Sequence, residues 1–530
     1  MGIKRLVINK WIVLLSNAVL FALMALLLPV HFEENDDVIM CMIANGVYSG
    51  TPDGHLVFIN ALYGWIIAGL YRLTKSVEWY TLSFCILHVL AMSGIACAIL
   101  KDNNMKLFPK VLFLAFMYVI WARIIIGFQF TTTAGLLCFS GCLALLQPSR
   151  KWRITGICAI FVASLIRFQA AALVGILCAP LLLAKVIEGR RFVFWLAGTA
   201  LLAMMGYCVD SLFYRQSDWA NYKEYNDIRG FINDNPNAVL AERNLPDGVD
   251  LQDYRMFCSF AGDPKIMTIS RLRTIKSEIE GSVSFRQVVS NMAQLRLYRI
   301  PLFLIYFGVL LCIVMNDKRS PYYIHLGHAR LNVKMVVLIS SCLLMSFILV
   351  YLGATASLKN RVFLCLLFPM VYLLASCWPE ENAHYKVLFR IFLVLVLSGM
   401  IIKYAWQDVK VRRLVQINQK EFEEFQYPLV KDLEGLLSFG TFHSEYLSPF
   451  GIKDMRFHCV GFGWCTCIPF QKGILECHRD FVDSDILVFG DMETSFDGFL
   501  ERLSRNYGLN AQLIIVNNNK KYALYKFVSQ

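Results

Sequence analysis

The chain has 530 residues, of which 57% are hydrophobic and 17% are charged, and its formal net charge is +12. Soluble domains carry about 25% charged residues, so this composition excludes an ordinary soluble protein and indicates a membrane protein. Its spans must be helices, because a backbone in lipid has to satisfy its hydrogen bonds within each segment. The positive charge is typical of basic cytoplasmic loops. No basic patch interleaved with aromatic residues indicates nucleic-acid binding.

The first apolar run, residues 11–31, follows Lys4, Arg5 and Lys10. About twenty apolar residues cross a bilayer, and basic flanks stay in the cytoplasm, so we expect a cytoplasmic N-terminus. The run is too long for a removed signal peptide and lacks the small-residue cleavage pattern, which predicts a retained anchor. The acidic cluster of residues 31–37 comes directly after it, so its four carboxylates are expected at the outer membrane boundary.

Ten further apolar runs are predicted to span the membrane. One more segment, His55–Tyr71, is almost long enough to cross. If it crossed, all the short basic loops that follow would move outside, against the positive-inside bias. We therefore predict that it lies along the outer face as an amphipathic segment. The eleven predicted spans are 11–31, 79–100, 108–127, 131–147, 154–170, 171–187, 192–213, 299–316, 333–355, 361–378 and 386–406.

This topology divides the chain into two parts. Residues 1–406 form an all-α polytopic membrane module with about eleven transmembrane helices, an interfacial helix and two outer loops, 32–78 and 214–298. Residues 407–530 carry more charge and short β-like stretches, which predict a small soluble α/β domain on the outer side. The elements predicted in this tail are a strand at 485–490, a helix at 495–507 and a hairpin formed by 511–516 and 522–527.

Several outer turns carry polar side chains on the side of the acidic cluster. A charge inside a bilayer costs roughly 3 kcal/mol, so such groups pair or face a cavity. Cations suit a phosphate head group, and carboxylates suit a general base or a metal. Simpler roles compete, since boundary arginines can snorkel and acids can form a solvated helix face. The outer-turn candidates are Arg123, Gln129, Arg167, Gln169, Asp210, Arg215, Lys359 and Arg361.

The order of these features resembles the GT-C superfamily of polytopic glycosyltransferases, which use polyprenyl-phosphate sugars as donors. The shared layout is a basic N-terminus, one span, an outer acidic pair (Asp36-Asp37), an interfacial segment and many further spans. The resemblance covers roughly residues 1–405, and the tail has no counterpart. The segments 128–133, 165–169 and 225–229 also look like those of uncharacterised bacterial membrane proteins of this type.

The resemblance implies that a hexose or pentose moves from a polyprenyl-phosphate donor to a glycan, lipid or protein acceptor, with inversion at the sugar carbon. It implies that one acid of the pair is the general base and leaves open which; we favour Asp36, with Asp37 either orienting Asp36 or binding a divalent cation such as Mg²⁺ or Mn²⁺. The sequence shows no histidine set for a metal. A bacterial inner membrane and a role in envelope polysaccharide biosynthesis follow from the same resemblance.

The donor phosphate would be held by cations that offset its charge in the transition state. Arg167 is the first candidate, together with Arg123, Arg361 or Lys359. Contacts with the acceptor or the head group are expected from Glu34, Gln129, Gln169 and Arg229.

Three other functions compete with this interpretation. A transporter or flippase for lipid-linked glycans would show inverted repeats and broken helices near mid-membrane, whereas the charges here gather at one face and the two halves show no similarity. A polysaccharide polymerase would not be expected to carry an acidic pair directly after its first span. A non-catalytic envelope scaffold predicts that the acidic pair is dispensable.

Overall fold

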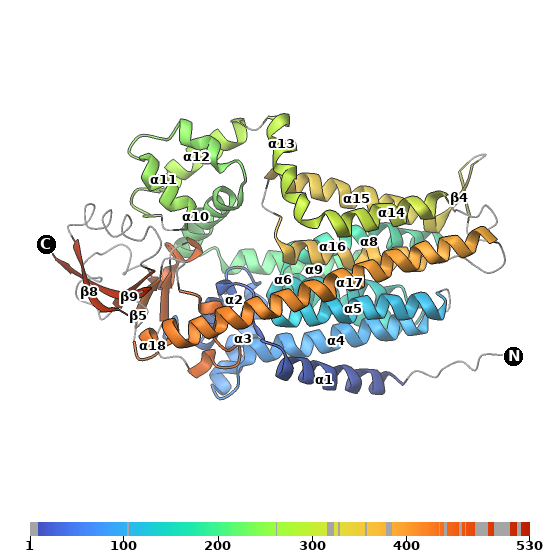
Figure 1. The fold of residues 1–530 in the computed structure, drawn as a ribbon, viewed down its shortest axis with the longest axis horizontal. Coiled ribbons are helices and arrows are strands. Elements are labelled where there is room, and N and C mark those ends of the chain that lie inside the picture. Colours follow the sequence, from blue (N-terminus) through green and yellow to red (C-terminus); the bar gives the residue numbers. More distant parts are fainter. Residues whose placement is uncertain are drawn as a thin grey trace.

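The computed structural model shows a long helical bundle with smaller domains at one end (Figure 1). It describes residues 9–529, except 103–104, 261, 283, 315–322, 327–328, 356–357, 378–383, 434, 439–441, 455–457, 462, 472–485, 492–508 and 517–520.

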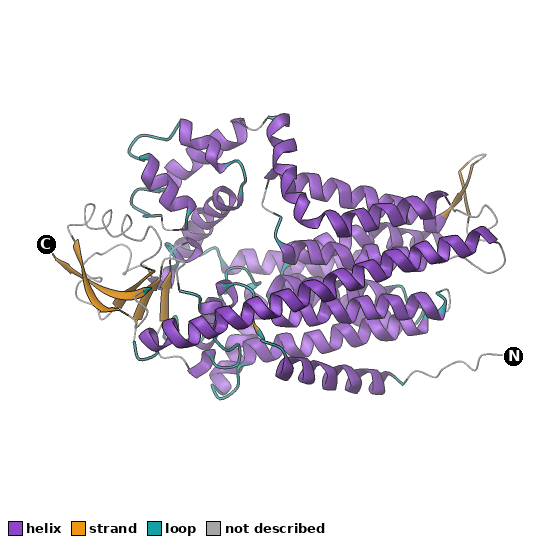
Figure 2. Cartoon of the chain, in the orientation of Figure 1, coloured by secondary structure: helices purple, strands orange, loops and turns teal. Residues whose placement is uncertain are grey.

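Helices that run side by side form the membrane module (Figure 2). Each of the eleven predicted spans overlaps one of them, although the break between α7 and α8 falls at Arg167, a few residues before the predicted boundary at 170–171. Eight helical segments of the described chain are long and apolar enough to cross a membrane, and one of them, Arg286–Val314, ends with α14. Helices α6, α7 and α16 have 16 or 17 residues and are shorter than these segments. The bundle consists of α1 (Lys10–Leu27), α4 (Trp79–Lys101), α5 (Leu107–Ile126), α6 (Phe130–Leu145), α7 (Arg150–Ile166), α8 (Phe168–Glu188), α9 (Phe192–Phe213), α14 (Arg299–Val314), α15 (Val333–Thr355), α16 (Asn360–Ser376) and α17 (His384–Glu421).

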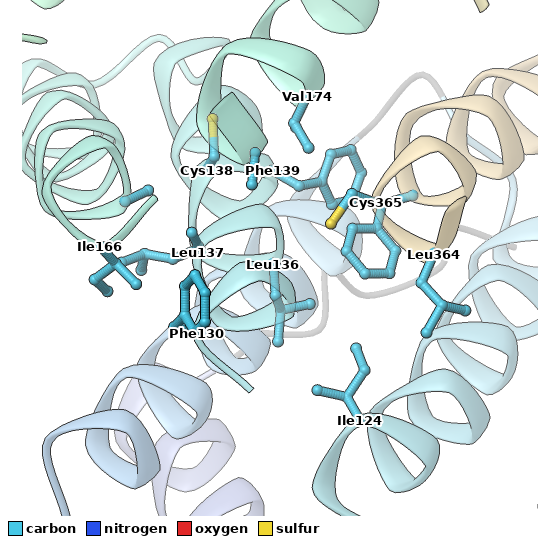
Figure 3. Packing of buried hydrophobic residues seen from close by; sticks show 14 of the residues in the cluster. Ile124, Phe130, Leu136, Leu137, Cys138, Phe139, Ile166, Val174, Leu364 and Cys365 are labelled. Carbon is cyan, nitrogen blue, oxygen red and sulfur yellow. The ribbon is translucent and has the colours of Figure 1, made fainter. Parts of the chain in front are cut away.

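The centre of the bundle is built from α6 and α16. Every side chain of α6 is buried, and so are residues 363–375 of α16. Helix α6 packs against α4, α7, α8 and α16, and Figure 3 shows Phe139 of α6 among side chains of the neighbouring helices, such as Val174 and Leu364. A helix that is apolar on all sides belongs inside a bundle, so α6 needs no lipid-facing surface along its 16 residues.

The acidic cluster belongs to a predicted outer loop. In the structure it begins a short helix. Strand β1 (His31–Phe32) pairs in parallel with β2 (Gly127–Phe128), and α2 (Asn35–Asn45) follows with Asp36 and Asp37 in its first turn. The helix dipole favours carboxylates at this position. Residues 37–45 are all buried, so α2 lies inside the protein and lacks an amphipathic pattern.

The predicted interfacial segment forms α3 (Ala61–Leu73). With 13 residues it is too short to span a bilayer, as expected. It packs on α2, α4, α7 and α9. Tyr63, Ile67 and Tyr71 are buried on one side, while Ile66 on the other is exposed. Burial on one side and exposure on the other agree with the amphipathic character predicted for the segment.

The segment 214–298 forms a helical insertion with its own hydrophobic core, which includes Ile232, Tyr254 and Leu272. It lies at the end of the bundle that carries α2, opposite the hairpin of β3 (Tyr323–Leu326) and β4 (Ala329–Asn332) (Figure 1). The insertion contains α10 (Ser217–Asp234), the 3₁₀ turn η1 (Ala238–Arg243), α11 (Leu251–Cys258), α12 (Ile269–Ser282), α13 (Phe285–Asn291) and the 3₁₀ turn η2 (Met292–Tyr298).

The tail contains a mixed five-stranded sheet in the order β6-β5-β7-β9-β8. The predicted strand and hairpin are present, while the predicted helix at 495–507 lies outside the described residues. Helix α17 runs without a break past residue 406, so the two predicted parts share one helix. The sheet consists of β5 (Gly435–Ser438), β6 (His458–Gly461), β7 (Ile486–Asp491), β8 (Leu509–Val516) and β9 (Tyr522–Ser529). The shorter helical pieces of the tail are η3 (Phe422–Gln426), α18 (Tyr427–Val430), η4 (Ser444–Tyr446), η5 (Ile452–Asp454), η6 (Gly463–Cys465) and η7 (Pro469–Gln471).

Close packing of α6 on α7 depends on two glycines that face each other. A Cβ atom at Gly156 would lie 2.7 Å from the carbonyl oxygen of Gly141. Because backbone cannot move aside cheaply, we expect Gly156→Ala to destabilise the protein by about 1–3 kcal/mol. Gly175→Ala on α8 is the matched control, since a Cβ there meets no atom within 4 Å. Thermal unfolding in detergent checks this, and equal melting temperatures for the two variants would refute it.

Candidate functional site

A cavity of about 910 Å³ lies where the membrane module, the helical insertion and the tail meet. We call it the main cavity. Its volume is in the range of about 300–1,000 Å³ that is usual for ligand pockets. The lining comes from α2, the turn between α7 and α8, α10, the start of α16 and the tail segment at η6. Eight of the candidates named from the sequence line it: Glu34, Asp36, Arg167, Gln169, Asp210, Arg229, Lys359 and Arg361.

Asp36 presents its carboxylate to the main cavity from the first turn of α2. Burial of this group raises the pKa of Asp36 above its usual range. The positive charge of Arg361 and a hydrogen bond from the indole of Trp464 offset part of that rise, whereas the negative charge of Glu34 adds to it. A carboxylate with a raised pKa accepts a proton more readily than an ordinary one, which suits a general base.

Two ion pairs fix the cationic side of the main cavity. The guanidinium of Arg361 pairs with the carboxylate of Glu34, and the Arg361 side chain is only 16% exposed. Lys359 lies 3.9 Å from Asp234 at the end of α10. Because the first pair joins α16 to the residue preceding α2, it holds a cation beside Asp36. The second pair joins the start of α16 to the helical insertion.

Arg167 and Arg229 are held by neutral groups. The guanidinium of Arg167 donates a hydrogen bond to the carbonyl oxygen of Phe58 at 3.3 Å and lies 5.4 Å from the ring centres of Phe58 and Phe130. The Nε of Arg229 donates to the side-chain oxygen of Asn226 at 3.0 Å. Within the described chain, neither arginine has a carboxylate at ion-pair distance. Both charges therefore remain available for an anionic ligand.

Asp37 does not line the main cavity. It is completely buried, and one carboxylate oxygen accepts a hydrogen bond from the Tyr80 hydroxyl at 2.8 Å. Burial holds the pKa of Asp37 well above its usual range. This placement does not fit a cation bound in the main cavity by Asp37. No group of three or more His, Cys, Asp or Glu side chains is placed to hold a metal ion in the part of the chain that the structure describes.

Gln129 and Arg123 also lie away from the main cavity. The side-chain oxygen of Gln129 accepts the backbone N–H of Thr131 at 2.7 Å, so this residue caps the start of α6. Arg123 lies close to the acidic cluster, and its positive charge interacts electrostatically with Glu33 and with Asp408 of α17. The hydrogen bond gives Gln129 a structural position at the start of α6.

Trp464, which the sequence did not single out, closes the main cavity from the tail. Its backbone carbonyl accepts a hydrogen bond from the Tyr222 hydroxyl at 2.7 Å, and its ring packs edge-on against Phe58 at 5.1 Å. The same indole hydrogen-bonds Asp36. The chain has ten tryptophans, and no feature of the sequence distinguishes this one. Only the fold brings it to the acidic cluster.

Comparison with known proteins gives little further guidance. No protein-family model matches the chain, and no curated protein matches it. Crystal structures of ArnT from Cupriavidus metallidurans are similar to it over 97% of this chain and 97% of theirs. The complex with undecaprenyl phosphate has a TM-score of 0.42 at 11% identity, and the apo form has 0.40 at 10%. Values this low do not assign a function.

The buried Asp37 carboxyl gives a prediction about stability and pH. Its pKa is higher in the folded chain than in the unfolded one, so the folded state binds the proton more tightly and this contribution to stability decreases as pH rises above about 4. Asp37→Asn removes this penalty and still offers an oxygen to Tyr80. We expect the melting temperature of Asp37→Asn, relative to that of the wild type, to increase as the pH rises from about 4 to 8.

The matched control is Asp454→Asn, because the Asp454 side chain is 70% exposed. Its melting curve is expected to follow the wild type at each pH. If the melting temperature of Asp37→Asn depends on pH as that of the wild type does, ionisation of the buried Asp37 carboxyl does not destabilise the protein.

Proposed function

We propose that this protein is a membrane glycosyltransferase that moves a sugar from a polyprenyl-phosphate donor to a hydroxyl group of an acceptor. The observation that supports this most strongly is that Asp36 shares the main cavity with Arg167 and Arg229, neither of which is paired with a described carboxylate. A proton acceptor beside available cations suits a reaction in which a hydroxyl attacks and a phosphate departs.

The apolar part of the main cavity suits a donor that stays in the membrane. Leu165 and Leu173, from α7 and α8, line it together with Leu352 of α15 and Val362 of α16. These helices belong to the membrane module, so an isoprenoid chain can lie among them while its phosphate reaches the cations. The hydrophobic effect favours this burial by about 25 cal/mol per Å² of apolar surface.

The proposed reaction is a single displacement. The acceptor oxygen forms a bond to the anomeric carbon of the sugar as the bond from that carbon to the phosphate oxygen breaks. Asp36 takes the proton of the attacking hydroxyl, and the electron pair of the broken bond leaves with polyprenyl phosphate. Arg167 and Arg229 stabilise the charge that develops on the phosphate. Attack from the side opposite the leaving group inverts the configuration of the sugar carbon.

We further propose that the main cavity opens on the outer side of a bacterial inner membrane. The basic loops around Lys101, Arg150 and Arg190 follow the ends of α4, α6 and α8 that lie away from α2. Cytoplasmic loops carry such an excess of Lys and Arg. This orientation places the N-terminus in the cytoplasm and the tail outside, where envelope glycans are assembled.

Replacing the proposed base tests the function directly. We expect Asp36→Asn to reduce transfer by about 10²–10⁴-fold, because the amide cannot accept the proton of the attacking hydroxyl. The measurement is incorporation of radiolabelled sugar by membranes supplied with polyprenyl-phosphate hexoses and pentoses, at matched protein levels. The exposed Asp454→Asn serves as the control. Unchanged transfer in Asp36→Asn would favour a scaffold or a transporter.

The neighbours of Asp36 predict opposite shifts in pH dependence. Activity decreases as the pH is lowered and the base becomes protonated, so the acidic limb of the kcat/KM profile follows the pKa of Asp36. Trp464→Phe removes a hydrogen bond that lowers this pKa, and the limb is expected at higher pH. Glu34→Gln removes a negative charge that raises it, and the limb is expected at lower pH. Shifts in the same direction would show that Asp36 is not the titrating base.

A further inference from the structure

A second cavity, of about 750 Å³, adjoins the main cavity. It lies between the end of α9, α10 and α12, and we call it the side cavity. Tyr207, Asp210, Lys223 and Asp227 line both cavities. A molecule that fills the side cavity therefore reaches the wall of the main cavity without crossing the bundle.

The lining of the side cavity is polar. Eleven of its thirteen lining residues carry a polar side-chain atom, and only Ala220 and Ile228 are aliphatic. The apolar surface that α7, α8, α15 and α16 give to the main cavity has no equivalent in this lining. Such a surface suits a water-soluble ligand and not a lipid chain.

The charges around the side cavity nearly cancel, because its lining carries four carboxylates and three cations: Asp210, Glu224, Asp227 and Glu280, and Lys223, Arg273 and Lys276. Arg273 of α12 forms an ion pair with Glu224 of α10, and the amine of Lys223 lies 4.6 Å from the ring centre of Tyr214. Lys276 lies 3.9 Å from Glu280. A lining in which opposite charges are mixed and nearly balanced attracts neither a phosphate nor a cation strongly. It offers donors and acceptors for the hydroxyl groups of a neutral molecule.

Tyr207 is an aromatic surface at the junction of the two cavities. Its side chain is exposed, and its ring contacts Phe168 of the main cavity at 5.6 Å. Asp210 stands one helical turn further along α9, fixed by a hydrogen bond from the backbone N–H of Ala61 at 2.7 Å. An aromatic ring beside fixed polar groups matches a sugar ring, which has an apolar C–H face and a rim of hydroxyls.

We propose that the side cavity binds the acceptor and that this acceptor is a hydrophilic oligosaccharide. This inference rests on the proposed function. The reacting hydroxyl passes between Tyr207 and Lys223 to reach Asp36, while the donor occupies the main cavity from the membrane side. The lipid-borne and the water-borne substrates thus approach through different openings, and only the sugar carbon and the hydroxyl meet.

Filling the side cavity separates acceptor binding from chemistry. Ser277→Trp on α12 and Ser211→Trp on α9 each place a bulky ring in the side cavity from opposite walls, and neither serine lines the main cavity. Thr274→Trp is the matched control, because Thr274 is exposed on α12 and lines neither cavity. Membranes are supplied with radiolabelled polyprenyl-phosphate sugar. Two products are measured: labelled glycan, and free sugar released when water replaces the acceptor.

We expect both filling variants to lose glycan labelling by roughly tenfold or more, equivalent to about 1.4 kcal/mol, and to keep the release of free sugar. Thr274→Trp is expected to keep both. Full glycan labelling in the two filling variants, with Asp36→Asn inactive, would overturn the side cavity as the acceptor site and leave the proposed function intact. Loss of both products in both variants would also overturn it, because water needs no side cavity.

The nature of the labelled product tests the acceptor class. After extraction with butanol and water, we expect the label of the wild-type product in the aqueous phase and resistant to protease. Label confined to the organic phase indicates a lipid acceptor, and protease-sensitive label indicates a protein acceptor; either result contradicts the oligosaccharide. If wild-type and Asp36→Asn membranes release and transfer the same amount of label, the proposed function itself fails, and this inference fails with it.

Discussion

The pairing of β1 with β2 is the constraint on which the site depends. These two short strands tie the chain just after α1 to the turn between α5 and α6, and the backbone N–H of Glu33 extends the pairing by donating to Phe128 at 3.1 Å. Helix α2 therefore starts at a fixed place and angle. Because successive helical residues point about 100° apart, the first turn directs Asp36 into the main cavity and Asp37 into the protein.

No single segment of the chain contains the site. The membrane module supplies Asp36 and Arg167, the helical insertion supplies Arg229, and the tail supplies Trp464. The hydrogen bond from the Tyr222 hydroxyl of the insertion to the backbone carbonyl of Trp464 joins the insertion to the tail beside the main cavity. The tail thus contributes to the surroundings of the proposed base, which gives it a function beyond that of an appended domain.

The sequence predicted the bundle well, because lipid imposes a length and a composition on every span. Arg167 could also be found, since it interrupts a continuous apolar run. The sequence could not separate Asp36 from Asp37, because two adjacent acids differ only in the direction that a helix gives them. Neither Trp464 nor the capping role of Gln129 had a local signal, since both depend on contacts that tertiary folding creates.

Asp36 and Asp37 show how surroundings assign different properties to the same side chain. Burial raises the pKa of both carboxyls. At Asp36, the Arg361 charge and the Trp464 indole oppose that rise, and the group faces the main cavity. Asp37 accepts a hydrogen bond from the Tyr80 hydroxyl, and its carboxyl is buried away from solvent. A proton acceptor must be reachable and must have its negative charge stabilised, and Asp36 is the member of the pair that faces the main cavity and has the Arg361 charge acting against its burial.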